Sequence, residues 1–300
     1  METGKAGQTQ TAFSEANGSL DELRMADGQM LCRRHWALAG AKRAVLIVHG
    51  LGEHSGRYHH VAAWFNARGF DVCSYDQRGH GLTSGPRGAL HQPDDLLTDL
   101  TAVYTDYAAV HPRAPLLLGH SMGGLVAARA VLDGRIEPGA MLLTSPALRT
   151  WESPGLRKLA HVLASILPNL PLGNGLKADN LSHDAAVVSA YRNDPLVFSK
   201  ITPRLADFIF RAGVACVADA AKLPIPTLLL VAGADKLVDP AGSTAFAAAA
   251  SPGGQLTTRH FAALFHELMN EAEPARTQVM KQMGDWLERL NQHPVSINFI

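Results

Sequence analysis

The sequence has no excess of charge of either sign. Lys and Arg together number 27 over 300 residues, and Asp and Glu also number 27, so the formal net charge is zero. Chains that bind nucleic acid, or that hold anionic membranes by charge, carry a clustered basic excess. We therefore expect no nucleic-acid partner, and nothing in the composition indicates an obligate protein partner.

Cysteines and long apolar runs are also scarce. The three cysteines, Cys32, Cys73 and Cys216, are odd in number and far apart. This pattern fits neither a disulfide framework nor a metal site, and it is typical of buried thiols in a reducing compartment. No run approaches the ~18 apolar residues of a membrane span, and residues 1–24 lack the apolar core of a signal peptide. We expect a soluble cytoplasmic protein with a flexible N-terminal tail at 1–24.

Short apolar runs alternate with helical patterns along most of the chain. Strands are predicted at 43–50, 70–75, 115–119, 140–144, 227–231 and 255–261, and helices at 59–68, 94–110, 122–133, 243–250 and 273–290. Apolar runs without polar alternation are typical of strands buried on both faces. Regular alternation of strand and helix favours a mostly parallel sheet with helices on both faces. The expected fold class is therefore α/β.

The stretch from 149 to 222 interrupts this alternation. It contains five prolines and helical patterns, but no strand of comparable strength. Between 156 and 170, apolar residues recur every three or four positions, which gives a helix one apolar face. That face fits either packing on the core or a cap over a functional site. We favour a helical cap at 149–222, inserted between the core segments 25–148 and 223–300.

The most specific motif is Gly-His-Ser-Met-Gly at 119–123, which follows the run Ala-Pro-Leu-Leu-Leu. An apolar strand that enters Gly-x-Ser-x-Gly and then a helix is the sequence form of a nucleophile elbow, which exposes its serine at a helix N-terminus. Both glycines are expected, because a side chain there would collide with the neighbouring strand and helix. Ser121 is the candidate nucleophile.

A nucleophilic serine needs an orienting acid and a base, which follow it in that order when it stands on an elbow. Asp235 comes directly after the apolar run at 227–231 and a short Ala-Gly-Ala turn, at the sheet edge where catalytic groups gather. Asp239 is the alternative acid. His266 follows the last predicted strand and is the favoured base, with His260, inside that strand, as the alternative.

Two loops complete the expected site. His49-Gly-Leu-Gly52 follows the first predicted strand, and its glycines let backbone amides turn inward. The N–H groups of Leu51 and Met122 are the expected oxyanion donors. The Gly-rich stretch 76–85 has no Gly-Lys-Ser/Thr of a phosphate loop, and we expect it to brace the loops beside the site.

Five segments resemble, in order, the monoacylglycerol lipase / lysophospholipase group of α/β-hydrolases. They are HGLGEHSGRY at 49–58, DQRGHGLTSG at 76–85, GHSMGG at 119–124, Ala-Asp at 234–235 and HELMNE at 266–271, and YRNDPLV at 191–197 is also similar. The resemblance implies an α/β-hydrolase fold with an eight-stranded sheet and a helical cap. It further implies no metal or organic cofactor, and hydrolysis of single-chain acyl esters of glycerol or related lipids.

The resemblance also implies a polar head-group pocket that includes Glu53 and Arg57; the alternative for this pair is a local surface salt bridge, which would contribute little to stability. Met269 stands where animal members of the group carry a second histidine, and Phe261-Ala-Ala stands where relatives often have Tyr-x-Gly. Both departures lie near the expected head group, so they bear on the choice of alcohol.

We predict a serine hydrolase of single-chain lipid esters, of the monoacylglycerol lipase or lysophospholipase type, acting through an acyl-enzyme. Apolar cap residues at 151–172 are expected to bind the acyl chain and to contact a membrane surface peripherally. The alternatives are a carboxylesterase of short-chain or aromatic esters, another chemistry such as amide cleavage or acyl transfer, and a catalytically inactive binding protein of the same fold. An inactive protein should have lost Ser121, Asp235 or His266, and all three are present.

Overall fold

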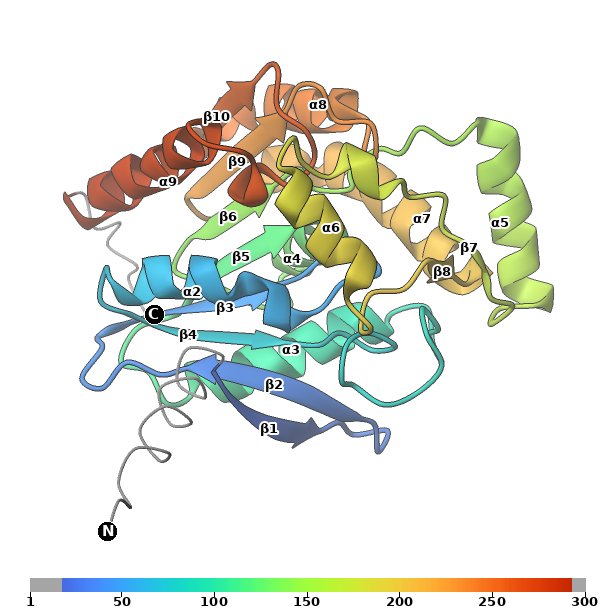
Figure 1. The fold of residues 1–300 in the computed structure, drawn as a ribbon, viewed down its shortest axis with the longest axis horizontal. Helices are drawn as coiled ribbons and strands as arrows, with labels where there is room; N and C mark the ends of the chain where they lie inside the picture. Colours follow the sequence, from blue (N-terminus) through green and yellow to red (C-terminus); the bar gives the residue numbers. More distant parts are fainter. Residues whose placement is uncertain (1–17, 293–300) are drawn as a thin grey trace, which may run out of the picture.

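The computed structural model describes residues 18–292 and places an eight-stranded, mostly parallel sheet at the centre of the molecule (Figure 1). The strands lie in the order β1-β2-β4-β3-β5-β6-β9-β10, and β1 and β2 pair antiparallel at one edge. Their bounds are β1 Ser19–Arg24, β2 Met30–Trp36, β3 Arg43–Val48, β4 Phe70–Tyr75, β5 Leu116–His120, β6 Met141–Thr144, β9 Thr227–Ala232 and β10 Leu256–Phe261. The predicted α/β-hydrolase fold is confirmed.

Helices cover both faces of this sheet. Their bounds are α2 His59–Asn66, α3 Asp95–Ala108, α4 Met122–Leu132, α5 Pro154–Ile166, α6 Ala185–Asn193, α7 Pro203–Asp219, α8 Pro240–Ala250 and α9 Ala275–Gln292. Alternate residues of a strand face opposite sides, so Val45 and Ile47 of β3 pack with α2 and α9, whereas Leu46 and Val48 pack with α3 and α4. The two resulting apolar cores explain why the central strands read as continuous apolar runs.

Strands β1 and β2 are absent from the sequence-based prediction. Strand β1 occupies residues 19–24, which we assigned to the flexible tail, so that assignment is corrected for these residues; residues 1–17 lie outside the described part of the chain. Most of β1 is exposed, and Arg33 of β2 donates hydrogen bonds to Asp21 of β1 at 2.7 and 2.9 Å. An edge hairpin held by polar cross-strand pairs gives no apolar run to detect.

The segment 149–222 lies between β6 and β9 and carries α5, α6 and α7, together with a two-stranded sheet of β7 (Leu172–Gly173) and β8 (Lys200–Ile201). Figure 1 shows these helices at the end of the sheet toward which the parallel strands run. Helix α5 packs on α7, and α7 in turn packs on α4. Of the helices within residues 18–292, none is long and apolar enough to cross a membrane.

Candidate active site

Ser121 occupies the turn between β5 and α4 with φ 53° and ψ −120°. A positive φ is strained for a residue with a side chain, and the neighbouring glycines show why the strain is kept. A Cβ on Gly119 would meet the Gly123 carbonyl oxygen at 2.6 Å, and one on Gly123 would meet the Val48 carbonyl oxygen at 2.2 Å. A side chain at either position would therefore collide with the adjacent helix or strand, as expected, and the two glycines permit the tight turn that carries Ser121 at the end of the sheet.

Three residues that are distant in sequence form one hydrogen-bonded series. The Nε2 atom of His266 lies 2.8 Å from the Ser121 Oγ atom, and its Nδ1 atom lies 2.6 Å from Asp235 Oδ2. The other carboxylate oxygen of Asp235 accepts the backbone N–H groups of Leu237 and Val238 at 2.8 and 2.9 Å. The acid is thus fixed by the loop after β9, and the imidazole is oriented with Nε2 toward the serine.

The charges of this series shift both pKa values. Burial alone would lower the pKa of His266, but the charge and hydrogen bond of Asp235, together with the charges of Glu267 and Glu53, hold that pKa above its ordinary value of 6.5. Burial raises the pKa of Asp235, yet the hydrogen bond and charge of His266 with two backbone N–H groups bring it below its usual range. Asp235 stays ionised at neutral pH, and the imidazole becomes a stronger base.

The alternative acid and base lie outside this series. Asp239 caps α8, because its Oδ1 atom accepts the Ala241 N–H at 3.0 Å while Oδ2 pairs with Arg149 at 2.8 Å. This cap, with Pro240 at the first helical position, starts α8 three residues before the predicted residue 243. His260 is exposed on β10, where it stands beside Val231 of β9.

The loop after β3 runs beside Ser121, and both Leu51 and Met122 line the cavity above the serine. Met122 is the first residue of α4, where backbone N–H groups have no partner inside the helix. The loop is held from behind by Gln77, whose backbone N–H donates to His49 Nε2 at 2.9 Å and whose side-chain amide donates to the His49 carbonyl at 2.6 Å.

Glu53, Arg57 and Glu267 form a buried ionic cluster against this loop. Arg57 donates to Glu53 at 2.7 Å and to both carboxylate oxygens of Glu267 at 2.6 and 2.8 Å. Glu53 also accepts the Gly50 N–H at 2.6 Å and the Tyr58 hydroxyl at 2.8 Å. Glu53 lines the cavity, whereas Arg57 is not among the lining residues. A salt bridge between Glu53 and Arg57 is therefore present, but it is buried, which corrects the surface salt bridge expected as the alternative.

Several site residues escaped the sequence-based prediction. The ring of His120 lies beside that of His266, with centroids 4.8 Å apart and planes tilted by 54°. The Nδ1 atom of His120 lies 2.9 Å from Thr144 Oγ1. Burial, reinforced by the charge of His266, lowers the pKa of His120 to about 4, so it stays neutral beside the base. Ser145, with φ 43°, donates its hydroxyl to the His266 carbonyl at 2.8 Å. Its place just after β6 at the carboxyl edge was the available signal.

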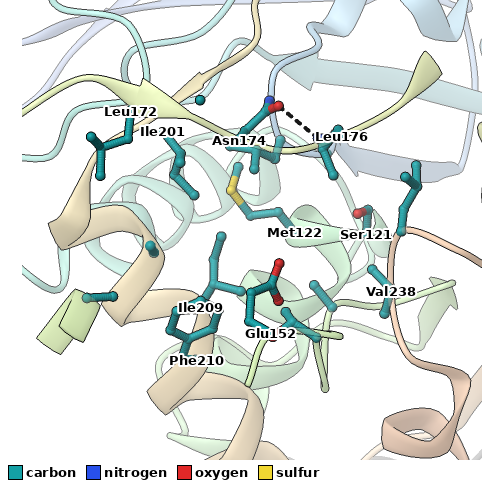
Figure 2. A pocket seen from close by; sticks show the side chains of 18 of the residues that line it. Ser121, Met122, Glu152, Leu172, Asn174, Leu176, Ile201, Ile209, Phe210 and Val238 are labelled. Atoms are coloured by element: carbon teal, nitrogen blue, oxygen red, sulfur yellow. Dashed lines mark hydrogen bonds between the residues drawn. The ribbon is translucent and has the colours of Figure 1, made fainter. Parts of the chain in front are cut away.

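Above Ser121 lies a cavity of about 220 Å³ with mainly apolar walls. Figure 2 shows Ser121 and Met122 at its floor, with Ile209 and Phe210 along one side. Helix α5 contributes a further wall, including Leu159, although this side chain is also half-exposed to solvent. The cavity therefore joins the serine hydroxyl to an apolar surface.

Among residues 18–292, no group of three or more His, Cys, Asp or Glu side chains is placed to hold a metal ion. Cys32, Cys73 and Cys216 are buried free thiols, as expected. Burial raises the pKa of Cys32 to about 11 and that of Cys216 to about 12, so these thiols are poor metal ligands and poor nucleophiles.

Comparison with known proteins adds family evidence to this geometry. The family described as serine aminopeptidase, S33, matches residues 39–273. A monoacylglycerol lipase from Mycolicibacterium smegmatis is 35% identical over 250 residues, covering 81% of this chain and 87% of that protein. A monoglyceride lipase from Rattus norvegicus is 32% identical over 278 residues, covering 89% and 90%.

A solved structure agrees with these sequence matches. The crystal structure of a Paleococcus ferrophilus monoacylglycerol lipase matches with a TM-score of 0.79 and 30% identity, covering 86% of this chain and 98% of that one. The range matched by the family includes Ser121, Asp235 and His266. The family match therefore spans the strands from β3 to β10 and the segments that carry the hydrogen-bonded series.

Proposed function

Because this chain belongs to the serine aminopeptidase S33 family of hydrolases, and is 35% identical to a monoacylglycerol lipase, we propose that it is a monoacylglycerol lipase or lysophospholipase. It is a carboxylic ester hydrolase that acts on esters of lipids. The observation that carries the proposal is that Asp235, His266 and Ser121 hydrogen-bond in series at the floor of an apolar cavity. Such a cavity fits one acyl chain better than a polar substrate.

In the proposed mechanism, Ser121 Oγ attacks the acyl carbonyl carbon while His266 Nε2 accepts the hydroxyl proton. Asp235 orients the imidazole and stabilises the imidazolium that forms. His266 then gives the proton to the departing alcohol oxygen, which leaves an acyl-enzyme. A water molecule, deprotonated by His266, attacks this ester and releases the fatty acid and the free Ser121 hydroxyl.

We assign the oxyanion to the backbone N–H groups of Leu51 and Met122. The first of these amides depends on the loop that Glu53 holds through the Gly50 N–H. We assign Glu53 to the head-group end of the cavity, because it lines the wall there together with Tyr191 and Glu267. Arg57 belongs to the same head-group site. It lies behind this wall and fixes Glu53 and Glu267 by hydrogen bonds.

We propose that 149–222 acts as a helical cap over a core of 25–148 and 223–300, and that α5 rests on a membrane surface. Between residues 151 and 172 the exposed large apolar side chains are Trp151, Leu156, Leu159, Val162, Ile166, Leu167, Leu170 and Leu172. So many exposed apolar side chains in one short segment favour contact with an apolar surface such as a membrane. The protein would then be cytoplasmic and peripherally attached, with no protein partner needed for activity.

The test is a hydrolysis panel with wild type and Ser121→Ala. Monoacylglycerols and lysophospholipids are compared with p-nitrophenyl esters of rising chain length and with aminoacyl anilides. Turnover of monoacylglycerol that is abolished by Ser121→Ala, with labelling of Ser121 by a fluorophosphonate, is the expected result. Turnover confined to the shortest esters would indicate a carboxylesterase instead, and cleavage of the anilides alone would indicate a peptidase. A lack of Ser121 labelling would indicate an inactive binding protein.

A further inference from the structure

Glu152 places a carboxylate on a mainly apolar part of the cavity wall, apart from the head-group end. It lines the cavity together with Ile209, Phe210 and Thr150. Figure 2 shows its carboxylate pointing into the cavity beneath Met122, beside Ile209 and Phe210. A charged side chain in an acyl-binding wall weakens the binding of a plain hydrocarbon chain, so its presence there calls for a ligand-based explanation.

Two polar atoms of this wall are buried without a partner. Neither Oε2 of Glu152 nor Oγ1 of Thr150 has a hydrogen-bond partner among the described residues, although both atoms are screened from solvent. Buried polar atoms in native proteins are nearly always hydrogen-bonded. The two residues are two positions apart in the chain and both line the cavity, so we treat them as one candidate subsite.

The neighbouring arginine does not satisfy this need. Arg157 lines a second cavity of about 230 Å³ that adjoins the first across Thr150, Ile209 and Phe210. Its Nη2 atom donates to the Thr150 carbonyl at 2.7 Å, and its own Nε atom is buried without a described partner. Among the described residues, no hydrogen bond or ion pair joins Arg157 to the Glu152 carboxylate.

We propose that Glu152 and Thr150 form a polar subsite that binds a hydroxyl group carried on the acyl chain of the substrate. The carboxylate accepts the hydroxyl hydrogen, and the Thr150 hydroxyl donates to the oxygen of the same group. A neutral hydroxyl fits the apolar surroundings better than an ammonium group, which costs far more to take from water. This inference rests on the proposed function, since it names the acyl group that the same cavity prefers.

The subsite has a direct consequence for specificity. An unsubstituted chain buries Glu152 and Thr150 with no partner, whereas a hydroxylated chain satisfies both. Sites built to hydrogen-bond a substrate hydroxyl discriminate strongly against the analogue that lacks it. We therefore expect one hydroxylated positional isomer to exceed the plain acyl glycerol by about ten-fold or more in kcat/KM.

The experiment compares a medium-chain monoacylglycerol with its mono-hydroxylated positional isomers on four proteins. These are wild type, Glu152→Leu, Thr150→Val and the matched control Glu137→Gln, which removes a charge from an exposed position. Fluorophosphonate labelling of Ser121 verifies that each variant retains a folded site. As a readout that needs no ester turnover, the free fatty acid and its hydroxylated isomers compete against that labelling.

We expect Glu152→Leu to abolish the preference for the hydroxylated isomer and to improve kcat/KM for the plain chain. Thr150→Val should weaken the preference, and Glu137→Gln should leave it at the wild-type ratio. A wild type without preference in both turnover and competition overturns the inference, as does a Glu152→Leu variant that keeps the ratio. If no monoacylglycerol is turned over, the proposed function fails, and the competition series alone decides whether the subsite exists.

Discussion

Arg57 binds both carboxylate oxygens of Glu267, the residue that directly follows His266, although 210 positions separate the two in the chain. The same guanidinium also holds Glu53, which accepts the N–H of Gly50. One buried cation therefore connects the loop beside Ser121 with the segment that carries the base. The cluster holds two carboxylates against one arginine, so its balance depends on that arginine.

Replacing Arg57 by Met should destabilise the fold and raise the pKa of His266. The substitution leaves the carboxylates of Glu53 and Glu267 buried without a cation, and breaking a buried pair in this way costs about 3–5 kcal/mol. Their unpaired charge also favours the imidazolium form of His266. Urea unfolding measures the first effect, and the pH dependence of kcat/KM measures the second.

The matched control is Lys281→Met, which removes an exposed partner of Asp285 in α9. A surface pair of this kind contributes about 0–1 kcal/mol, so the control should unfold close to wild type. If Arg57→Met unfolded like Lys281→Met, the cluster would have no structural role.

Replacing Glu267 by Gln should shift the pH profile in the opposite direction. The base must be neutral to accept the proton, so kcat/KM falls as the pH drops through the pKa of His266. In wild type that midpoint should lie above pH 6.5, because the carboxylates of Asp235, Glu267 and Glu53 together outweigh burial. Removing the charge of Glu267 should move the midpoint to lower pH. A midpoint that stayed in place would show that Glu267 does not act on the base, and the exposed His260→Gln serves as control.

Replacing Gly123 by Ala should cost both stability and activity. The new Cβ would lie 2.2 Å from the Val48 carbonyl oxygen and 2.4 Å from that of His49, and neither backbone atom can move freely. Overpacking of this kind costs about 1–3 kcal/mol and displaces Ser121 from His266. Gly155→Ala is the control, because its nearest neighbour is the Ser153 Oγ atom at 3.9 Å. Equal melting temperatures for the two variants would contradict the steric account.

The sequence revealed those parts of the site that local chemistry specifies. Ser121 stands in a motif that requires its glycines, because a Cβ on Gly119 or Gly123 would lie 2.2–2.6 Å from a backbone oxygen. The sequence motif and the geometry of the turn therefore have one cause. Asp235 and His266 could be placed by chain order and by strand ends. The central strands are readable because both of their faces are buried, in two separate cores.

The parts that escaped prediction depend on contacts between distant segments. Glu267 gains its importance from Arg57, and Ser145 from the carbonyl of His266, 121 positions away. Glu152 is noteworthy because its Oε2 atom has no hydrogen-bond partner among the described residues. No local sequence pattern encodes the lack of a partner. Strand β1 is mostly exposed, and polar side chains link it to β2. Its sequence therefore resembles that of a loop.

Asp235→Asn and Asp239→Asn should separate the catalytic acid from the helix cap. Asn at 235 would disturb the tautomer of His266 and leave the imidazolium without its counter-charge, which in Ser-His-Asp enzymes lowers kcat by about 10⁴-fold. Asn at 239 can still cap α8, so the Asp239→Asn variant should lose about 1 kcal/mol of stability or less. Its kcat should stay close to wild type. Steady-state kinetics and urea unfolding on both variants check this pair. The reverse pattern would make Asp239 the acid.

Ile166→Glu should weaken membrane binding without changing the chemical step. Ile166 is 67% exposed on α5 and is not among the residues that line the cavity, so hydrolysis of a water-soluble short-chain ester should be unchanged. On phospholipid vesicles, a charge in the apolar face of α5 opposes burial in the interface, and sedimentation should show less bound protein. Val110→Glu is the matched control, since Val110 is 77% exposed after α3, far along the chain from the cap. Of the four tryptophans, Trp151 lies just before α5 and is 56% exposed, so the intrinsic tryptophan fluorescence should shift to the blue on vesicles in wild type and Val110→Glu, and should not shift in Ile166→Glu. If both variants bound vesicles like wild type, α5 would not be the contact surface, because a charge on a helix face that enters the membrane must weaken binding.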